Sequence, residues 1–329
     1  LGDGATFVFK SGDEYFNIFP CWDYLLIPGT TTEYSTQCPV DSHVGHYGAT
    51  NTVGGVSNGL AAVSSWYFEA PSFTADPKKG ESSCSQSLSF FRTTIFLDSM
   101  YVVLTAGLRT NTTAPVLTTL DSRLLNGAVT AWKSLDTGPQ QLNRGNHSAT
   151  EMMMLHHDSI GYFFPMGANV SVINDRVVGN WTSLAIDQSG EEVHDVFTAV
   201  VHHGNNLKGE IFEYIVFPVV SLANFSQLVN EYVAKTRVIE NSERAQVLFV
   251  NGTSSLASKS GGEFLGGMIF DNSTTITAPY FGRVSPFAQV TSAFILQHHY
   301  PTMDDMNLSL AGINDNKILQ ATSPMACST

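Results

Sequence analysis

Positively charged side chains are scarce in this sequence. The chain of 329 residues has 16 Lys and Arg against 29 Asp and Glu, which gives a formal net charge of −13. Nucleic acids and anionic membranes bind basic surfaces, so neither is an expected partner. An acidic polysaccharide would need a local basic groove. The sequence also lacks an apolar run long enough to span a bilayer, so we expect no membrane insertion.

Several motifs of enzyme and metal sites are also missing. The sequence contains no GxSxG elbow, no HExxH helix and no phosphate-binding loop, which argues against hydrolase, zinc protease and nucleotide-binding functions. Its four cysteines show no CxxC spacing, which favours two disulfide bonds over a metal site. We therefore expect neither a metal nor another cofactor. We predict the disulfides Cys21–Cys38, which would close a short loop, and Cys84–Cys327.

Asn-X-Ser/Thr sequons, in contrast, are numerous, and each is a potential site for an N-linked glycan on the surface of a secreted protein. The eight sequons begin at Asn111, Asn146, Asn169, Asn180, Asn224, Asn251, Asn272 and Asn307. Together with the cysteine pattern, they indicate a secreted or cell-surface glycoprotein. The start of the chain, LGDG, has neither the basic residues nor the apolar core of a signal peptide. We therefore expect a mature or trimmed product.

Short apolar or alternating runs bounded by Gly, Asn, Asp or Pro dominate the chain, and such runs are typical of β-strands. Examples are residues 6–9, 88–97, 101–104, 196–202, 211–220 and 245–250. Only residues 224–235 have a helical pattern, with Asn224 as the expected N-cap. The sequence therefore predicts an all-β fold, a large antiparallel β-sandwich with little helix. We assign residues 1–300 to this β-domain and residues 301–329 to the start of a small C-terminal β module or tail.

A series of short motifs follows in order along the chain. Trp22-Asp23-Tyr24 precedes a Pro-Gly-Thr-Thr turn at residues 28–31, and the Gly-rich segment Val53–Gly59 comes next. TTLDSR at residues 118–123 and HDSIGYFFP at residues 157–165 follow. With these motifs the chain resembles polysaccharide lyase family 8, which contains hyaluronate, chondroitin and xanthan lyases. The resemblance implies that family's central β-supersandwich, which is galactose mutarotase-like.

The resemblance also implies an activity, the cleavage of acidic polysaccharide by β-elimination at a uronic acid. One group neutralises the carboxylate, a base takes the C5 proton and a Tyr protonates the leaving oxygen. The family's catalytic Asn, His, Tyr and Arg lie mainly on an N-terminal α/α-toroid, and we expect this chain to start after that domain. We therefore assign no catalytic residue and expect the chain alone to be inactive. The implied partners are acidic polysaccharide and either an α/α-toroid domain or other copies of the chain.

Four residues are candidates for substrate binding: Trp22, Asp23, Glu33 and Asn58. Trp22 could stack on a pyranose face, with Asp23 and Glu33 lining the same cleft. The alternative is a core Trp beside a turn whose Asp accepts from backbone amides. Asn58 could donate to a sugar carboxylate or hydroxyl, or it could be a left-handed turn residue that needs no ligand.

The few basic side chains offer a second kind of candidate. Arg92, Arg109, Arg123 and Arg144 could each pair a uronate through two hydrogen bonds. The alternative for each of them is an ordinary salt bridge within the protein.

Three functions remain open at this stage. The chain could be the β-domain of a lyase, a carbohydrate-binding β-domain without catalysis, or a self-assembling structural glycoprotein of the cell surface. Unsaturated uronate products would distinguish the first, and glycan binding without such products would distinguish the second. Ordered multimers with large apolar contacts would identify the third.

Overall fold

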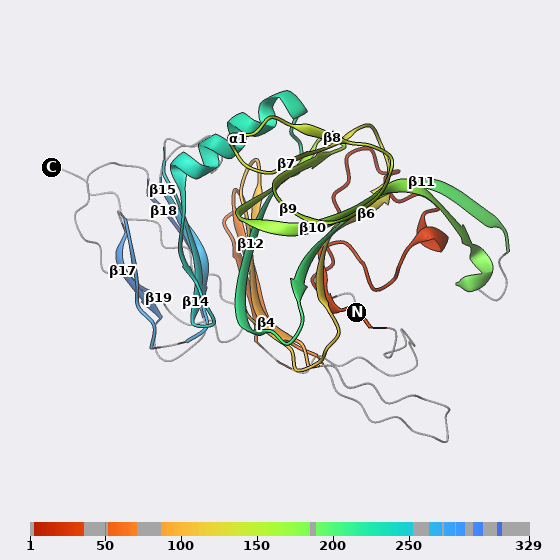
Figure 1. Ribbon diagram of the computed structural model, residues 1–329. Helices are drawn as coiled ribbons and strands as arrows, with labels where there is room; N and C mark the ends of the chain where they lie inside the picture. The colour runs from red at the N-terminus through yellow and green to blue at the C-terminus, as the bar shows by residue number, and fades with distance from the viewer. Residues whose placement is uncertain are drawn as a thin grey trace, which may run out of the picture. The chain divides into compact units, whose positions relative to one another are not determined.

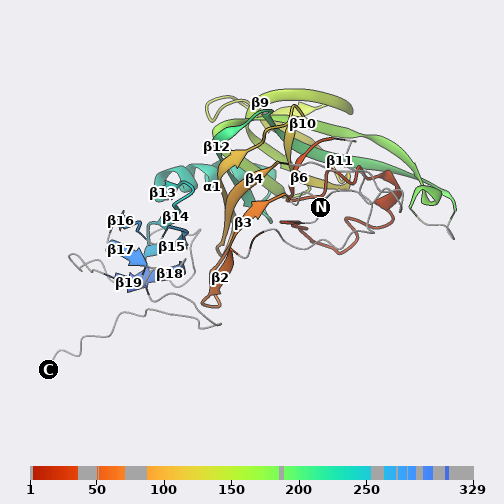
Figure 2. The same cartoon turned by 90° about the horizontal axis from the view of Figure 1, so that it is seen from below.

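The computed structural model describes residues 3–35, 50, 52–70, 87–184, 189–252, 263–271, 273–279, 281–286, 292–298 and 308–310. The chain forms two compact units and passes between them several times (Figures 1 and 2). Unit 1 contains Leu1–Tyr47, Ala70–Leu88 and Thr110–Leu207, and unit 2 contains Gly48–Glu69, Ser89–Arg109 and Lys208–Thr329. Strands dominate, and the predicted all-β sandwich fold is confirmed. In the described part of the chain, no helix is both long and apolar enough to cross a membrane.

Unit 1 is built on antiparallel strands in the order β1-β6-β11-β10-β9-β7-β8. Their bounds are Thr31–Glu33 (β1), Val116–Leu124 (β6), Val129–Trp132 (β7), Gln140–Leu142 (β8), Gly145–His157 (β9), Ile160–Asn180 (β10) and Glu191–Gly204 (β11). Residues 116–123 of β6 are all buried, so this strand carries its side chains into protein on both faces. Two short 3-10 helices, Phe19–Cys21 (η1) and Trp181–Ser183 (η3), complete the described elements.

A tight turn joins β9 to β10. Asp158 and Ser159 both have positive φ, 49° and 61°, and His157 pairs directly with Ile160. Two successive positive φ angles are those of the two-residue hairpin turn that matches the twist of its strands. The short polar side chain of Asp tolerates this left-handed conformation. The turn thereby places the side chains of His157 and Asp158 inside unit 1, where both are buried.

Unit 2 contains a sheet in the order β12-β5-β4-β3-β2, a second in the order β13-β14-β15-β18, and a small third one of β16, β17 and β19. Its elements are Val53–Ser57 (β2), Ala62–Glu69 (β3), Ser89–Phe96 (β4), Tyr101–Arg109 (β5), Lys208–Phe217 (β12), Leu222–Lys235 (α1), Thr236–Asn241 (β13), Ala245–Val250 (β14), Glu263–Ile269 (β15), Ile276–Ala278 (β16), Gly282–Pro286 (β17), Ser292–His298 (β18) and Leu308–Leu310 (β19). Strands β15 and β18 of the second sheet lie against β3 of the first, so the two sheets face each other as a sandwich. A core containing Val247, Phe249, Leu265 and Phe294 lies on the second sheet.

Helix α1 differs in its start from the prediction. It begins at Leu222, two residues earlier than expected, and its N-cap is Ser221, whose hydroxyl accepts from the Asn224 N–H at 3.3 Å. Asn224 therefore lies in the first turn and is not the cap. The predicted apolar face is present, because Phe225, Val229 and Tyr232 are buried.

The predicted boundary at residue 300 stays a prediction. Within the described residues beyond it, β19 pairs in parallel with β17. The segment 308–310 thus shares a sheet with residues 282–286 of unit 2.

Candidate functional site

Trp22 lies at a corner of unit 1 that is closed by the turn at Pro28 and Gly29. Gly29 has a φ of +85°, and a Cβ there would lie 2.5 Å from the Gly4 carbonyl oxygen, so only glycine fits. The turn is bonded on both sides, since Thr6 N–H donates to Pro28 O and Gly29 N–H donates to Thr119 O, each at 2.8 Å. The predicted Pro-Gly turn therefore joins the start of the chain to β6.

The ring of Trp22 is half-buried among other aromatic side chains. The centroids of Phe7, Tyr15, Phe19 and Tyr24 lie 5.2–6.2 Å from its own centroid. Its Nε1 donates to the Ser122 carbonyl oxygen at 3.1 Å. These contacts agree with the alternative of a Trp that packs within the protein beside the turn. Its stacking on a sugar stays a prediction.

Asp23, in contrast, is exposed beside Trp22. Its Oδ1 accepts from the Leu25 N–H at 2.9 Å, as expected for an Asp in a turn, and its Oδ2 accepts from the Tyr34 hydroxyl at 2.7 Å. This hydrogen bond, together with partial burial, raises the pKa of Tyr34 to about 12. Tyr34 is 37% exposed and was missed by sequence reasoning, although it directly follows the candidate Glu33. Asp23 and Tyr34 form a polar pair that solvent can reach.

Glu33, at the end of β1, is only 3% exposed. Its carboxylate accepts from the hydroxyl of Thr110, from the hydroxyl of Thr112 at 3.0 Å, and from the N–H and hydroxyl of Ser87 at 3.3 Å. These donors satisfy a buried carboxylate without bringing it to the surface. Glu33 thus joins β1 to neighbouring segments of unit 1, and its contact with substrate stays a prediction.

Asn58 belongs to unit 2, where it closes the turn between β2 and β3. Its Oδ1 accepts from the N–H groups of Leu60 and Ala61 at 3.0 and 2.8 Å. The residue with positive φ is Gly59, at +86°, so the left-handed position predicted for Asn58 is one residue further on. Its side-chain oxygen has a structural role in the turn, and its donation to a sugar stays a prediction.

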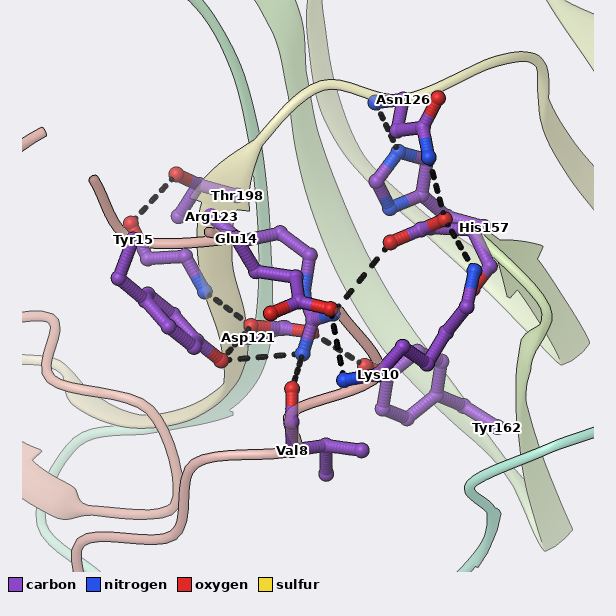
Figure 3. Close-up of polar contacts among 12 residues, drawn as sticks. Val8, Lys10, Glu14, Tyr15, Asp121, Arg123, Asn126, His157, Tyr162 and Thr198 are labelled. Carbon is purple, nitrogen blue, oxygen red and sulfur yellow. Dashed lines mark hydrogen bonds and ion pairs between the residues drawn. The ribbon is translucent and has the colours of Figure 1, made fainter. Parts of the chain in front are cut away.

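A buried polar network lies between the start of the chain and β6 (Figure 3). Arg123 Nε donates to Asp121 Oδ2 at 2.6 Å, and its Nη2 donates to Val8 O at 2.8 Å and to the Tyr15 hydroxyl at 3.0 Å. The hydroxyl of Tyr162 donates to Asp121 Oδ2 at 2.8 Å, and that of Tyr15 donates to Oδ1 at 3.2 Å. Burial opposes the charge on Arg123, but the Asp121 carboxylate outweighs it and raises the pKa of the guanidinium. Arg123 is therefore a charged partner within the protein.

The same network holds the segment 8–15. Lys10 Nζ pairs with Asp158 Oδ1 at 2.7 Å, and the Glu14 carboxylate accepts from the N–H groups of Lys10, Ser11 and Gly12 at 2.6–3.0 Å. Burial alone would raise the pKa of Glu14, but these backbone donors stabilise the charged form and lower it to about 2. The Lys10–Asp158 ion pair and the hydrogen bond from Arg123 to Val8 O thus hold this segment to the rest of unit 1, and the described residues 3–30 contain no strand.

His157 lies beside this network as a neutral side chain. Its Nε2 accepts from the Asn126 N–H at 3.1 Å, and its ring stacks on Phe197 with centroids 4.0 Å apart. Burial and the nearby Arg123 charge lower the pKa of His157 to about 3. The charges of Asp121 and Arg123, and those of Lys10 and Asp158, are paired within the protein, so the network contributes to holding the fold.

The other arginine candidates also interact within the protein. Arg109 pairs with Glu243, and Arg144 Nη2 lies 2.5 Å from Asp195 Oδ1. Arg92 is buried and donates from Nε to the Thr105 hydroxyl at 3.1 Å. Salt bridges are therefore the observed contacts of Arg109, Arg123 and Arg144. Among the described residues, no group of three or more His, Cys, Asp or Glu could hold a metal ion.

The cysteine and sequon predictions have separate outcomes. Cys21 is a buried, free thiol whose Sγ lies 3.6 Å from the carbonyl oxygens of Val177 and Glu192, so the predicted Cys21–Cys38 bond is not what the structure holds. Its sulfur points toward β10 and β11 and contacts backbone there. The predicted partner Cys38, and both members of Cys84–Cys327, lie outside the described residues. Five of the sequon asparagines are exposed: Asn111, Asn146, Asn169, Asn180 and Asn224. Asn251 is partly buried. Asn272 and Asn307 lie outside the described residues.

Comparison with known proteins places these features in a family. Residues 1–229 match the super-sandwich domain of polysaccharide lyase family 8. Over 253 residues, 76% of this chain, the sequence is 32% identical to chondroitinase-AC of Pedobacter heparinus. The chain belongs to polysaccharide lyase family 8. It is also 25% identical to the hyaluronate lyase HylB of Enterococcus faecalis over 258 residues, 75% of this chain.

Solved structures of family 8 lyases share the fold. A chondroitinase AC lyase studied in complex with oligosaccharides matches with a TM-score of 0.60 and 23% identity, covering 89% of this chain and 44% of that one. A xanthan lyase of Paenibacillus matches with a TM-score of 0.58 and 19% identity, covering 81% of this chain and 26% of that one. The chain spans 33% of the length of the Pedobacter chondroitinase and 25% of that of the Enterococcus lyase. Within the part that it shares with these lyases, residues 1–229 match the super-sandwich domain.

Proposed function

We propose that this chain is the β-domain of an extracellular polysaccharide lyase-like glycoprotein that acts on acidic polysaccharide by β-elimination. The main support for this proposal is the family match over residues 1–229, together with relatives named as chondroitinase and hyaluronate lyase. In the network of Figure 3, Lys10 pairs with Asp158 and Arg123 pairs with Asp121, so these charges act within the protein. The chain alone is therefore inactive, and a further domain, an α/α-toroid, supplies the base and the acid.

The contribution of this chain is binding, and Asp23 with Tyr34 is the pair best placed for it. Both are exposed enough to reach a ligand, and their hydroxyl and carboxylate can donate to and accept from sugar hydroxyls. Trp22 precedes Asp23 in the sequence, and its half-buried ring is available to a pyranose face. Glu33 supports this surface of unit 1 through the segments that it fixes, whereas Asn58 fixes the turn between β2 and β3 of unit 2.

A direct test uses the chain with hyaluronan, chondroitin sulfate, alginate and xanthan. We expect no absorbance from unsaturated uronate, because without a positioned base the C5 proton is not removed. A clear rise from the isolated chain would refute the proposed division of roles. Binding of oligosaccharides is expected to weaken in Tyr34→Ala and Asp23→Asn but not in Asp136→Asn, which changes an exposed carboxylate elsewhere in unit 1.

A second candidate function is interaction without catalysis, as a carbohydrate-binding or self-assembling glycoprotein of the cell surface. One observation favours it: Phe7, Phe9, Phe16 and Phe19 are 39%, 60%, 67% and 41% exposed on one segment of unit 1. Exposed apolar surface of this kind marks contact sites. Light scattering tests the self-assembling form of this function, because self-assembly requires multimers that Phe9→Ser and Phe16→Ser together dissociate, and glycan binding without unsaturated products tests the carbohydrate-binding form.

A further inference from the structure

Two buried nitrogens near Asp158 have no hydrogen-bond partner among the described residues. They are Nη1 of Arg123 and Nδ1 of His157, on residues that are 0% and 1% exposed. A buried polar group without a hydrogen bond destabilises the folded state, so these two nitrogens call for a partner.

Both nitrogens are donors. The Nε2 atom of His157 accepts from the Asn126 N–H at 3.1 Å, and a backbone N–H can only donate. In the neutral imidazole the proton is therefore on Nδ1. Arg123 is charged, and each of its nitrogens donates. Figure 3 shows Asn126 at one ring nitrogen of His157, with the other ring nitrogen on the side of Arg123.

An acceptor with spare capacity lies next to them. Asp158 Oδ1 accepts from Lys10 Nζ at 2.7 Å and from Asn126 Nδ2 at 2.8 Å. Asp158 Oδ2 is 3.5 Å from Arg123 Nη1, which is longer than a normal hydrogen bond. Arg123 Nη1 is thus 3.5 Å from Asp158 Oδ2, and His157 lies near enough for the Arg123 charge to lower its pKa.

We propose that this region is a binding site for one water molecule, which accepts from Arg123 Nη1 and His157 Nδ1 and donates to Asp158 Oδ2. Three hydrogen bonds are typical of a buried water. An ion fits less well, because the charges of Arg123 and Lys10 are balanced by those of Asp121 and Asp158. A halide would face the Asp158 carboxylate, and a metal cation would face the guanidinium.

The bound water has a structural consequence for unit 1. It links β6, through Arg123, to the β9–β10 turn, through His157 and Asp158. Lys10 pairs directly with Asp158, and Val8 O accepts directly from Arg123. The water therefore completes the set of contacts that hold the segment 8–15 in place.

A crystal structure of the whole chain from bromide-containing solution tests the site at a resolution that shows ordered waters. We expect a peak within hydrogen-bond distance of all three atoms, with no anomalous signal at the bromine edge. An anomalous peak there would show an anion site and overturn the proposal. Ordered side chains with no peak between them would overturn it equally.

Two measurements in solution give independent results. In ¹⁵N NMR, His157 is expected as the Nδ1–H tautomer with a cross peak from that proton to a long-lived water; an Nε2–H tautomer contradicts the proposal. His157→Phe keeps a ring against Phe197 but removes the Nδ1 donor, so the water peak is expected to disappear. A water retained unchanged in this variant would overturn the part assigned to His157. If the variant does not fold, the NMR result on the unmodified chain still decides.

Discussion

Asp121 and Arg123 form an ion pair two residues apart on β6, with Arg123 Nε 2.6 Å from Asp121 Oδ2. Side chains at positions i and i+2 of a strand point to the same face, so the two charges are brought together by the strand itself. Both side chains are at most 3% exposed. Loss of either partner is therefore expected to lower the stability of the fold.

Replacing Arg123 with Met is expected to lower the free energy of unfolding by about 3–5 kcal/mol, because Asp121 is left as a buried unpaired charge. Urea unfolding measures the change. The matched control is Arg176→Met, since Arg176 pairs with Asp195 but is 68% exposed. An exposed pair contributes about 0–1 kcal/mol. Equal losses in the two variants would contradict the assigned role.

Glu14 is expected to make stability depend on pH in the acid range. Its pKa falls from an ordinary value of 4.5 to about 2 on folding, chiefly because backbone N–H groups outweigh burial. The contribution is fully present above pH 4.5 and is lost as the pH falls toward about 2, since the unfolded chain binds the proton first. Urea unfolding from pH 6 to about pH 2 checks this. In Glu14→Gln, the stability difference from the unmodified chain should shrink as the pH falls; a constant difference would exclude this carboxylate as the cause.

Gly179 lies where β10 contacts η1. A Cβ there would be 2.0 Å from the Pro20 carbonyl oxygen, and backbone cannot move aside as a flexible side chain can. We expect Gly179→Ala to destabilise the chain by about 1–3 kcal/mol. Gly138→Ala is the control, because a Cβ at Gly138 meets nothing within 4 Å. Its change in unfolding free energy should stay within about 0.5 kcal/mol. Comparable losses at the two sites would show that the contact with Pro20 is unimportant.

Cys21 is expected to behave as a protected thiol. Burial raises its pKa, which reduces the reactive thiolate, and the surrounding backbone excludes reagents. A thiol reagent should label Cys21 slowly in the folded chain and rapidly in urea without any reductant, as peptide mapping by mass spectrometry would show. Labelling that needs prior reduction would demonstrate a disulfide instead.

N-linked glycans are expected on most of the exposed sequons when the protein is made by a secretory pathway. Asn111, Asn146, Asn169 and Asn224 are exposed, so an attached glycan can extend into solvent. Asn180 is exposed as well, but its Oδ1 accepts from the N–H and hydroxyl of Thr182. These hydrogen bonds hold the side chain to which a glycan would be attached. Intact mass before and after glycan removal gives the occupancy. Fewer than about three occupied sites would refute the secreted-glycoprotein hypothesis.

The fold could be predicted because its signals are local. Residues 211–220 and 245–250 were predicted as strands from their apolar runs, and β12 and β14 occupy most of those ranges. The helix was predicted from its apolar face but misplaced at its start, because Ser221 and Asn224 are both suitable caps and only the backbone decides between them. The ordered motifs were enough to place the chain in its family.

The site was harder to predict, since its contacts join residues distant in sequence. The sequence by itself determined an acidic β-sandwich, the Pro28-Gly29 turn and the adjacent charges of Asp121 and Arg123. Only the tertiary structure decided that Glu33 is buried, that Tyr34 accompanies Asp23, and that Lys10 pairs with Asp158 at a separation of 148 residues. Periodicity fixes which face of a strand a side chain occupies, but not which strand lies beside it. That neighbour determines whether a charged group meets a partner, water or a substrate.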